Sequence, residues 1–68
     1  MEKFNERLKQ LRTAKGLSQK ELASLLGLTT SAIGNYEIGL REPSIEIIKN
    51  LCKFFDVSSD YLLGLSDF

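Results

Sequence analysis

The side chains that most often carry out chemistry in proteins are scarce in this sequence. Its 68 residues include no histidine and a single cysteine, Cys52. Zinc is usually held by histidine and cysteine ligands, and nucleophilic or acid–base catalysis needs a base positioned beside the reacting group. Cys52 also falls among apolar residues at helical spacing, where a buried core thiol is expected. We therefore expect no enzyme, no catalytic residue, no metal and no cofactor.

Hydroxyl side chains stand instead at positions where they can begin helices. Ser18 precedes Glu21 by three residues, which is the spacing of a capping box, in which each side chain accepts a hydrogen bond from the other residue's free backbone N–H. Thr29, Ser44 and Ser58 precede further apolar segments and can cap them in a similar way. Glycines follow several of these segments, as is typical of helix ends.

Apolar spacing and these caps together predict five helices and no strands. The helices are expected over residues 4–15, 18–26, 29–37, 44–55 and 58–63. The apolar residues of the fourth helix predict a core stripe that comprises Ile45, Ile48, Leu51, Cys52 and Phe55. The chain is therefore expected to be all-α.

Domain organisation and location follow from what interrupts the chain. No linker is long enough to divide it, so we expect one domain over residues 1–64, followed by a short tail over residues 65–68. No apolar run approaches the roughly 20 residues of a membrane span. The N-terminal sequence MEKFNERLKQ is charged from its second residue and does not resemble a secretory signal. We expect a cytoplasmic protein with no membrane contact.

The net charge of zero conceals an uneven distribution. Nine basic and nine acidic residues cancel, which argues against a strongly polyanion-binding protein. Residues 1–20 hold six basic and two acidic side chains, a net charge of +4, whereas residues 21–68 hold three basic and seven acidic ones, a net charge of −4. This asymmetry gives one face a positive field, or else it reflects two ordinary solvated helix faces.

Residues 18–38 predict two short helices that fold sharply against each other. A close helix crossing leaves no room for a large side chain, and Ala23 stands at that place, four residues before Gly27. The apolar residues around it are Leu22, Leu26, Leu28, Ile33 and Tyr36. This order is the helix-turn-helix pattern, in which the second helix projects its outer face into the major groove of DNA.

From Leu8 to Gly64 the sequence resembles the Cro/C1-type (Xre-family) helix-turn-helix domains of phage repressors, controller proteins and bacterial regulators. The segments that carry the resemblance are LSQKELA, YEIG, the single proline before the fourth helix, and VSSDYLLG. The resemblance implies a compact five-helix bundle of the lambda-repressor-like type. It also implies a transcriptional regulator, expected to be a repressor, that binds double-stranded DNA at specific sequences.

The resemblance further implies which residues would read bases. The recognition helix would cover residues 29–37 and would contact base edges from its first turns. The positions that match are Thr30, Ser31, Gly34 and Asn35. An asparagine amide can bond adenine through two hydrogen bonds, and a threonine methyl group can pack on a thymine methyl group.

The same resemblance implies phosphate contacts and an internal ion pair. Gln19 would approach the DNA backbone, helped by the positive end of the helix dipole. Because no basic residue stands between Lys20 and Arg41, we expect these two residues to supply further phosphate contacts. Arg12 and Glu37 would form a buried pair that ties the first helix to the end of the third. The alternative is that these two residues are exposed charges.

The recognition helix departs from the family in charge. No basic residue stands between Lys20 and Arg41, so an arginine that could read guanine is absent. Family members often carry asparagine in place of Ile38 and lysine in place of Leu40. Gly34 weakens the helix by about 1 kcal/mol relative to alanine, or it permits close approach to bases. These departures leave a rival function open, a protein-interaction module that keeps the fold but binds DNA weakly or not at all.

Recognition by one such helix offers few contacts, so we expect a homodimer on a pseudo-palindromic operator. Ile47 and Phe54 are seven residues apart and lie beside the core stripe of the fourth helix. Leu62, Leu65 and Phe68 are expected to add apolar surface near the C-terminus. The alternative is that Phe54 and Phe68 cover the core of a monomer.

Overall fold

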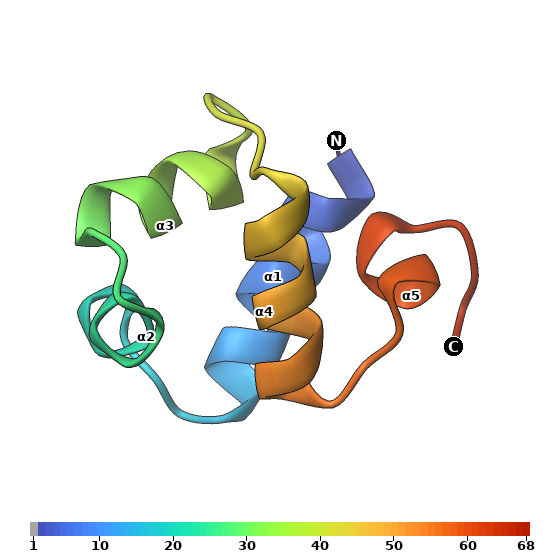
Figure 1. The fold of residues 1–68 in the computed structure, drawn as a ribbon, viewed down its shortest axis with the longest axis horizontal. Coiled ribbons are helices and arrows are strands. Elements are labelled where there is room, and N and C mark those ends of the chain that lie inside the picture. The colour runs from blue at the N-terminus through green and yellow to red at the C-terminus, as the bar shows by residue number, and fades with distance from the viewer. Residues whose placement is uncertain (1) are drawn as a thin grey trace.

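The computed structural model describes residues 2–68, and all statements below concern that range. The helices are α1 (Glu2–Ala14), α2 (Gln19–Leu26), α3 (Thr30–Ile38), α4 (Ile45–Phe55) and α5 (Ser59–Leu63). Figure 1 shows α2 and α3 at one side of the molecule, α5 and the C-terminus at the other, and α4 crossing in front of α1 between them. The prediction of an all-α, five-helix fold is confirmed, with α1 beginning two residues earlier than expected.

The predicted helix caps form in the structure. The Ser18 N–H donates to the Glu21 carboxylate at 2.8 Å and the Glu21 N–H donates to Ser18 Oγ at 3.0 Å, so the capping box is complete. The bond from the Ser18 backbone, and then the bond with its side chain, lower the pKa of Glu21 below its ordinary value. Thr29, Ser44 and Ser58 cap α3, α4 and α5 in turn, each through its side-chain oxygen.

Gly64 ends α5 at a place where the chain needs glycine for two reasons. Its φ of +80° lies in the left-handed region that other residues rarely adopt. A Cβ atom at this position would also lie 2.3 Å from the Lys3 Cβ atom, so a side chain would collide with α1. The absence of a side chain therefore lets the end of α5 rest against the start of α1.

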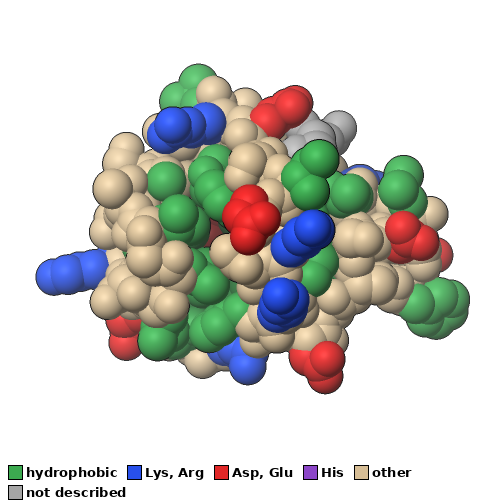
Figure 2. Space-filling model, in the orientation of Figure 1, with side chains coloured by type: hydrophobic (Ala, Val, Ile, Leu, Met, Phe, Trp, Pro, Cys, Tyr) green, Lys and Arg blue, Asp and Glu red, His purple; other side chains and the backbone are tan. Residues whose placement is uncertain are grey.

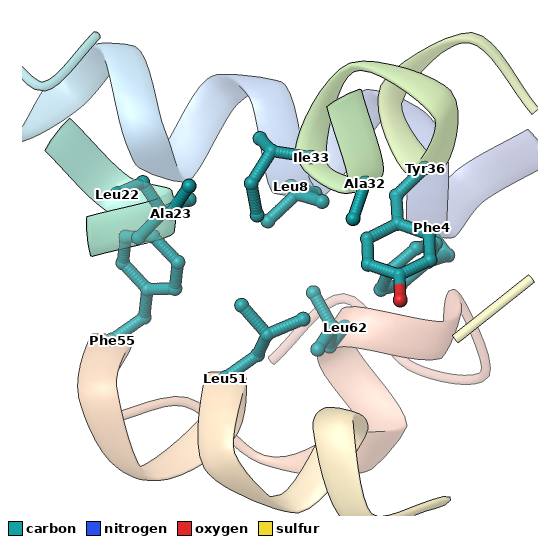
Figure 3. Packing of buried hydrophobic residues seen from close by; sticks show 10 residues of the cluster. All are labelled: Phe4, Leu8, Leu22, Ala23, Ala32, Ile33, Tyr36, Leu51, Phe55 and Leu62. Atoms are coloured by element: carbon teal, nitrogen blue, oxygen red, sulfur yellow. The ribbon is translucent and has the colours of Figure 1, made fainter. Parts of the chain in front are cut away.

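All five helices contribute to one core, whose side chains point toward one another in Figure 3. The buried hydrophobic residues are Phe4, Leu8, Leu22, Ala23, Ala32, Ile33, Tyr36, Leu51, Phe55 and Leu62. The rings of Phe4 and Tyr36 meet edge to face with their centroids 6.4 Å apart, which joins α1 to α3. Ala23 is buried at the corner between α2 and α3, where the sequence predicted room only for a small side chain.

Two apolar residues lie differently from the sequence prediction. Ile45 is 74% exposed because it is the first residue of α4, so it does not belong to the core stripe. Leu62 is fully buried because the inner face of α5 packs against the rest of the core. Leu62 therefore cannot add apolar surface for a second molecule, and that part of the predicted dimer interface is wrong.

Candidate nucleic-acid interface

The turn between α2 and α3 is held by backbone hydrogen bonds. The N–H groups of Gly27 and Leu28 both donate to carbonyl oxygens of the last turn of α2, the Leu28 bond reaching Ala23 O at 2.8 Å. Gly27 has the left-handed φ of +69° that this reversal requires. The half-buried Leu28 side chain packs against the core beneath the turn. The direction in which α3 leaves α2 is therefore fixed by local bonds and by packing.

The two sides of α3 differ sharply in burial. Ala32, Ile33 and Tyr36 form its inner face and are buried in the core. At about 100° of rotation per residue, the remaining positions form a strip on the opposite side. We call it the outer strip, and it comprises Thr30, Ser31, Gly34, Asn35 and Ile38. The structure thus brings the four residues with predicted base contacts together on one side of one helix.

The outer strip carries no charge. The only charged residue of α3 is Glu37, and its side chain is just 3% exposed. Arg12 donates to it through Nε at 2.6 Å and through Nη2 at 3.0 Å, and Gln19 Nε2 donates at 3.0 Å. Figure 2 shows, in the same orientation as Figure 1, a surface over α2 and α3 that is mostly without charged side chains.

The contact between Arg12 and Glu37 ties three elements together. The third donor of the guanidinium, Nη1, bonds the Leu17 carbonyl oxygen at 2.8 Å, so Arg12 also fixes the link between α1 and α2. The hydrogen bond with Glu37 raises the pKa of Arg12 above its ordinary value. Burial of the guanidinium acts in the opposite direction but is the smaller effect. The structure places these two residues in the buried arrangement that the family resemblance implied, and their bidentate geometry is the strong form of such a pair.

The three residues with predicted phosphate contacts have unequal surroundings. Lys20, in the first turn of α2, and Arg41, in the loop after α3, are both exposed. Gln19 is half-buried, and its amide nitrogen donates a hydrogen bond to Glu37. A Cβ atom on Gly34 would lie 3.5 Å from Gln19 Oε1, which is ordinary contact, so packing does not require glycine there.

Sequence reasoning missed the role of Arg7. Its guanidinium carbon lies 4.2 Å from the centroid of the Tyr61 ring, and Nη1 donates to the Tyr61 and Ser66 carbonyl oxygens. Nη2 lies 3.6 Å from the Asp67 carboxylate. Arg7 thereby joins α1 to α5 and the tail across more than fifty residues of sequence, a separation at which no local pattern gives a signal.

Two of the six basic side chains among residues 1–20, Arg7 and Arg12, are therefore engaged inside the fold. A third, Lys15, has its Nζ atom 5.6 Å from the centroid of the Phe54 ring. The basic excess of the N-terminal part is thus only partly available to a polyanion. Lys20 is the basic residue of this part that lies on α2 itself.

Four of the predicted dimer residues remain accessible to different degrees. Ile47 and Phe54 are half-buried on α4, and Leu65 and Phe68 are exposed beyond α5. Phe68 is 92% exposed, although the Ser58 hydroxyl donates to its carbonyl oxygen at 2.8 Å. Figure 2 shows hydrophobic side chains gathered beside the charged outer surface of α4.

Comparison with known proteins agrees with this geometry. A helix-turn-helix family model matches residues 8–62. The chain belongs to the Cro/C1-type helix-turn-helix family. This helix-turn-helix chain is 47% identical over 60 residues to the SPbeta prophage-derived HTH-type transcriptional regulator YonR of Bacillus subtilis (strain 168), in an alignment that covers 88% of the chain and 56% of YonR. The chain therefore spans little more than half of that relative.

Two solved structures share the helix-turn-helix fold over almost their whole length. The restriction-modification controller protein C.AhdI from Aeromonas hydrophila is 46% identical, with a TM-score of 0.80, over 90% of this chain and 92% of that one. The P22 c2 repressor, solved in complex with a synthetic operator, is 30% identical, with a TM-score of 0.81, over 87% and 89% of the two chains. These similarities show the lambda-repressor-like architecture and a family of transcriptional regulators rather than enzymes.

Proposed function

We propose that this chain is the DNA-binding part of a cytoplasmic transcriptional regulator, with α3 seated in the major groove of double-stranded DNA. The observation that carries the proposal is the contrast between the two sides of α3. Its inner face and its only charge are locked into the domain, while its outer strip is left to face a partner. The similar P22 c2 repressor was solved with an operator, and we therefore propose repression as the outcome of binding.

Roles for individual residues follow from their exposure and chemistry. The outer strip offers Thr30, Ser31 and Asn35 to base edges, with Gly34 allowing the backbone to come close. Two exposed cations, Lys20 on α2 and Arg41 in the loop after α3, are proposed to contact phosphates; such contacts orient the domain without selecting a sequence. Gln19 is proposed to approach a phosphate from the first residue of α2, while its amide nitrogen keeps its bond to Glu37.

Salt dependence of binding tests this proposal. Retention on double-stranded DNA should fall steeply as the salt concentration rises, because phosphate contacts release counterions. Replacing Lys20 by alanine should weaken binding to all sequences and reduce the slope of log K against log salt by about 1. Lys49→Ala, a matched loss of one exposed cation on α4, should leave this slope nearly unchanged. Absence of salt-dependent retention would refute the proposal.

We also propose that the protein acts as a two-fold homodimer on a pseudo-palindromic operator. Ile47, Phe54, Leu65 and Phe68 supply accessible apolar surface on α4 and beyond α5. Two domains related in this way would present their recognition helices one turn of DNA apart, roughly 34 Å. Doubling the half-sites compensates for the absence of charged contacts from the outer strip of each α3.

A protein-interaction module is the second candidate function. It is favoured by the uncharged outer strip and by exposed apolar side chains at the end of α3 and after it, Ile38, Leu40 and Ile45. Such a module would bind a protein partner through these side chains and would show no retention on DNA beyond that of an unrelated domain of zero net charge. The salt titration described above separates the two functions.

A further inference from the structure

The outer strip lacks both charged means of recognising a G·C base pair in the major groove. Guanine is most often read by arginine or lysine donating to O6 and N7, and cytosine by a carboxylate accepting from N4. No arginine or lysine lies on α3. Its one carboxylate, Glu37, is 3% exposed and already accepts hydrogen bonds from Arg12 and Gln19. The strip therefore has no charged group to offer to either base of that pair.

What the strip does hold suits an A·T pair. Asn35 carries an amide whose oxygen can accept from adenine N6 and whose nitrogen can donate to adenine N7. Thr30 carries a methyl group that can meet the 5-methyl group of thymine. Ser31 is neutral in this respect, because a hydroxyl group can bond to any of the bases.

Ile38 extends the strip with a larger apolar group. It stands three residues after Asn35 and seven after Ser31, which places it on the same side of the helix. It is 69% exposed, so it contributes little to packing of the core. An apolar side chain beside an adenine-reading amide has one hydrophobic feature to meet in the major groove, the thymine 5-methyl group.

We propose that the outer strip selects A·T base pairs and that Ile38 is a specificity-determining residue that contacts a thymine 5-methyl group beside the adenine bound by Asn35. This inference rests on the proposed function, since it assumes that α3 lies in the major groove. It adds the class of base pair that the site accepts and a reading residue at the end of the helix.

The experiment removes the methyl group from the DNA and the side chain from the protein. A preferred half-site is first selected from a random duplex pool, and each thymine in it is then replaced singly by deoxyuridine, which lacks only the 5-methyl group. The unmodified protein should lose about fourfold in affinity at the thymine that meets Ile38, which is the factor expected for one buried methyl group. Ile38→Ala should bind the thymine and deoxyuridine duplexes equally at that position.

Two matched variants serve as controls. Ile38→Val keeps a branched apolar side chain and should keep the preference for thymine. Leu40→Ala removes a similarly exposed apolar side chain two residues beyond the strip and should also keep it. Because Ile38 and Leu40 are exposed, the thermal midpoints of all three variants should match that of the unmodified protein.

The possible failures are distinguishable. A pool from which no sequence is enriched would refute the proposed function and this inference together. An enriched half-site with G·C pairs at the positions facing α3, or a deoxyuridine effect that persists in Ile38→Ala, would overturn the inference while leaving DNA binding established. An unmodified protein that is indifferent to every deoxyuridine substitution would overturn it in the same way.

Discussion

Glu37 is a charged residue on the proposed recognition helix, yet its contacts belong to the fold. Three donor groups from Arg12 and Gln19 surround its carboxylate, and almost none of its side-chain surface reaches solvent. In a buried ion pair, the mutual attraction and the hydrogen bonds offset the cost of removing the two charges from water. Removal of one partner leaves the other charge uncompensated. The pair thus holds α3 in place from within while the outer strip stays free of charge.

Replacing Arg12 by alanine should nearly unfold the protein at room temperature. The variant leaves Glu37 buried without its cation, at a cost of about 3–5 kcal/mol. A domain this small has a total stability in the lower part of the usual range, about 5–15 kcal/mol. Urea unfolding followed by circular dichroism measures the loss.

The matched control removes both charges at once. Arg12→Met combined with Glu37→Leu should recover most of the stability, because an apolar pair of similar volume needs no charge compensation. A shift of only a few degrees in the thermal midpoint of Arg12→Ala would show that the pair contributes little, contrary to its burial.

The start of α2 is closed by a complete capping box. Ser18 and Glu21 satisfy each other's backbone N–H groups, and Gln19 and Lys20, both proposed phosphate contacts, lie between them. The capping box therefore sets the position of the residues that would approach the DNA backbone. Its loss would loosen α2 at the point where the proposed interface begins.

The capping box should make stability depend on pH in the acid range. Because the pKa of Glu21 is lowered in the folded state, its contribution to stability is complete above the pKa of the unfolded chain and is lost as the pH falls through the folded pKa. Glu21→Gln keeps an acceptor for the Ser18 N–H but cannot titrate. Thermal midpoints measured from pH 6 to pH 3 should therefore fall less for Glu21→Gln than for the unmodified protein. Equal decreases in the thermal midpoints of the two proteins would contradict a stabilising role of the Glu21 carboxylate in the capping box.

The sequence predicted the helices because each helix end is determined by residues only a few positions apart. Ser18 and Thr29 cap the helices that follow them, and Gly27 takes the left-handed conformation that the turn requires. The sequence could not show that Leu62 turns inward or that Ile45 turns outward, because both depend on how α4 and α5 pack on the other helices.

The candidate site likewise has one part that the sequence predicted and another part that depends on contacts between distant elements. The positions of Thr30, Ser31 and Asn35 on one side of α3 follow from helical periodicity, so the sequence predicted them together. The bond from Gln19 to Glu37 and the contacts of Arg7 join elements that are distant in the chain, and no spacing rule reports them. The family resemblance supplied the Arg12–Glu37 contact, which periodicity alone would have left as two surface charges.

At the scale of the whole molecule, the proposed homodimer depends on apolar surface that one copy leaves accessible. Phe54 is half-buried; its ring packs edge to face with that of Phe55 at 5.0 Å, and Lys15 Nζ lies 5.6 Å from its centroid. It therefore both covers the core and remains available to a second copy. Leu65 and Phe68 are more exposed and lie beyond the last helix.

Phe54→Glu should convert the dimer to monomers that bind a single half-site weakly. A carboxylate at the centre of the apolar interface would be desolvated on association, which opposes dimer formation. Sedimentation equilibrium, free and with operator DNA, measures the assembly state. Ile45→Glu, at an exposed apolar position outside the proposed interface, is the matched control and should stay dimeric. An unmodified protein that is monomeric at high concentration, both free and on DNA, would end the dimer model.

A comparison of selected DNA sequences shows whether α3 reads bases through its outer strip. The unmodified protein and Asn35→Ala would each be used to enrich binding sites from the same random duplex pool. The unmodified protein should enrich a defined half-site, and Asn35→Ala should lose about 1–3 kcal/mol of discrimination at one base pair while the other positions keep their preferences. Identical preferences for the two proteins, or no enrichment by either, would contradict the claim.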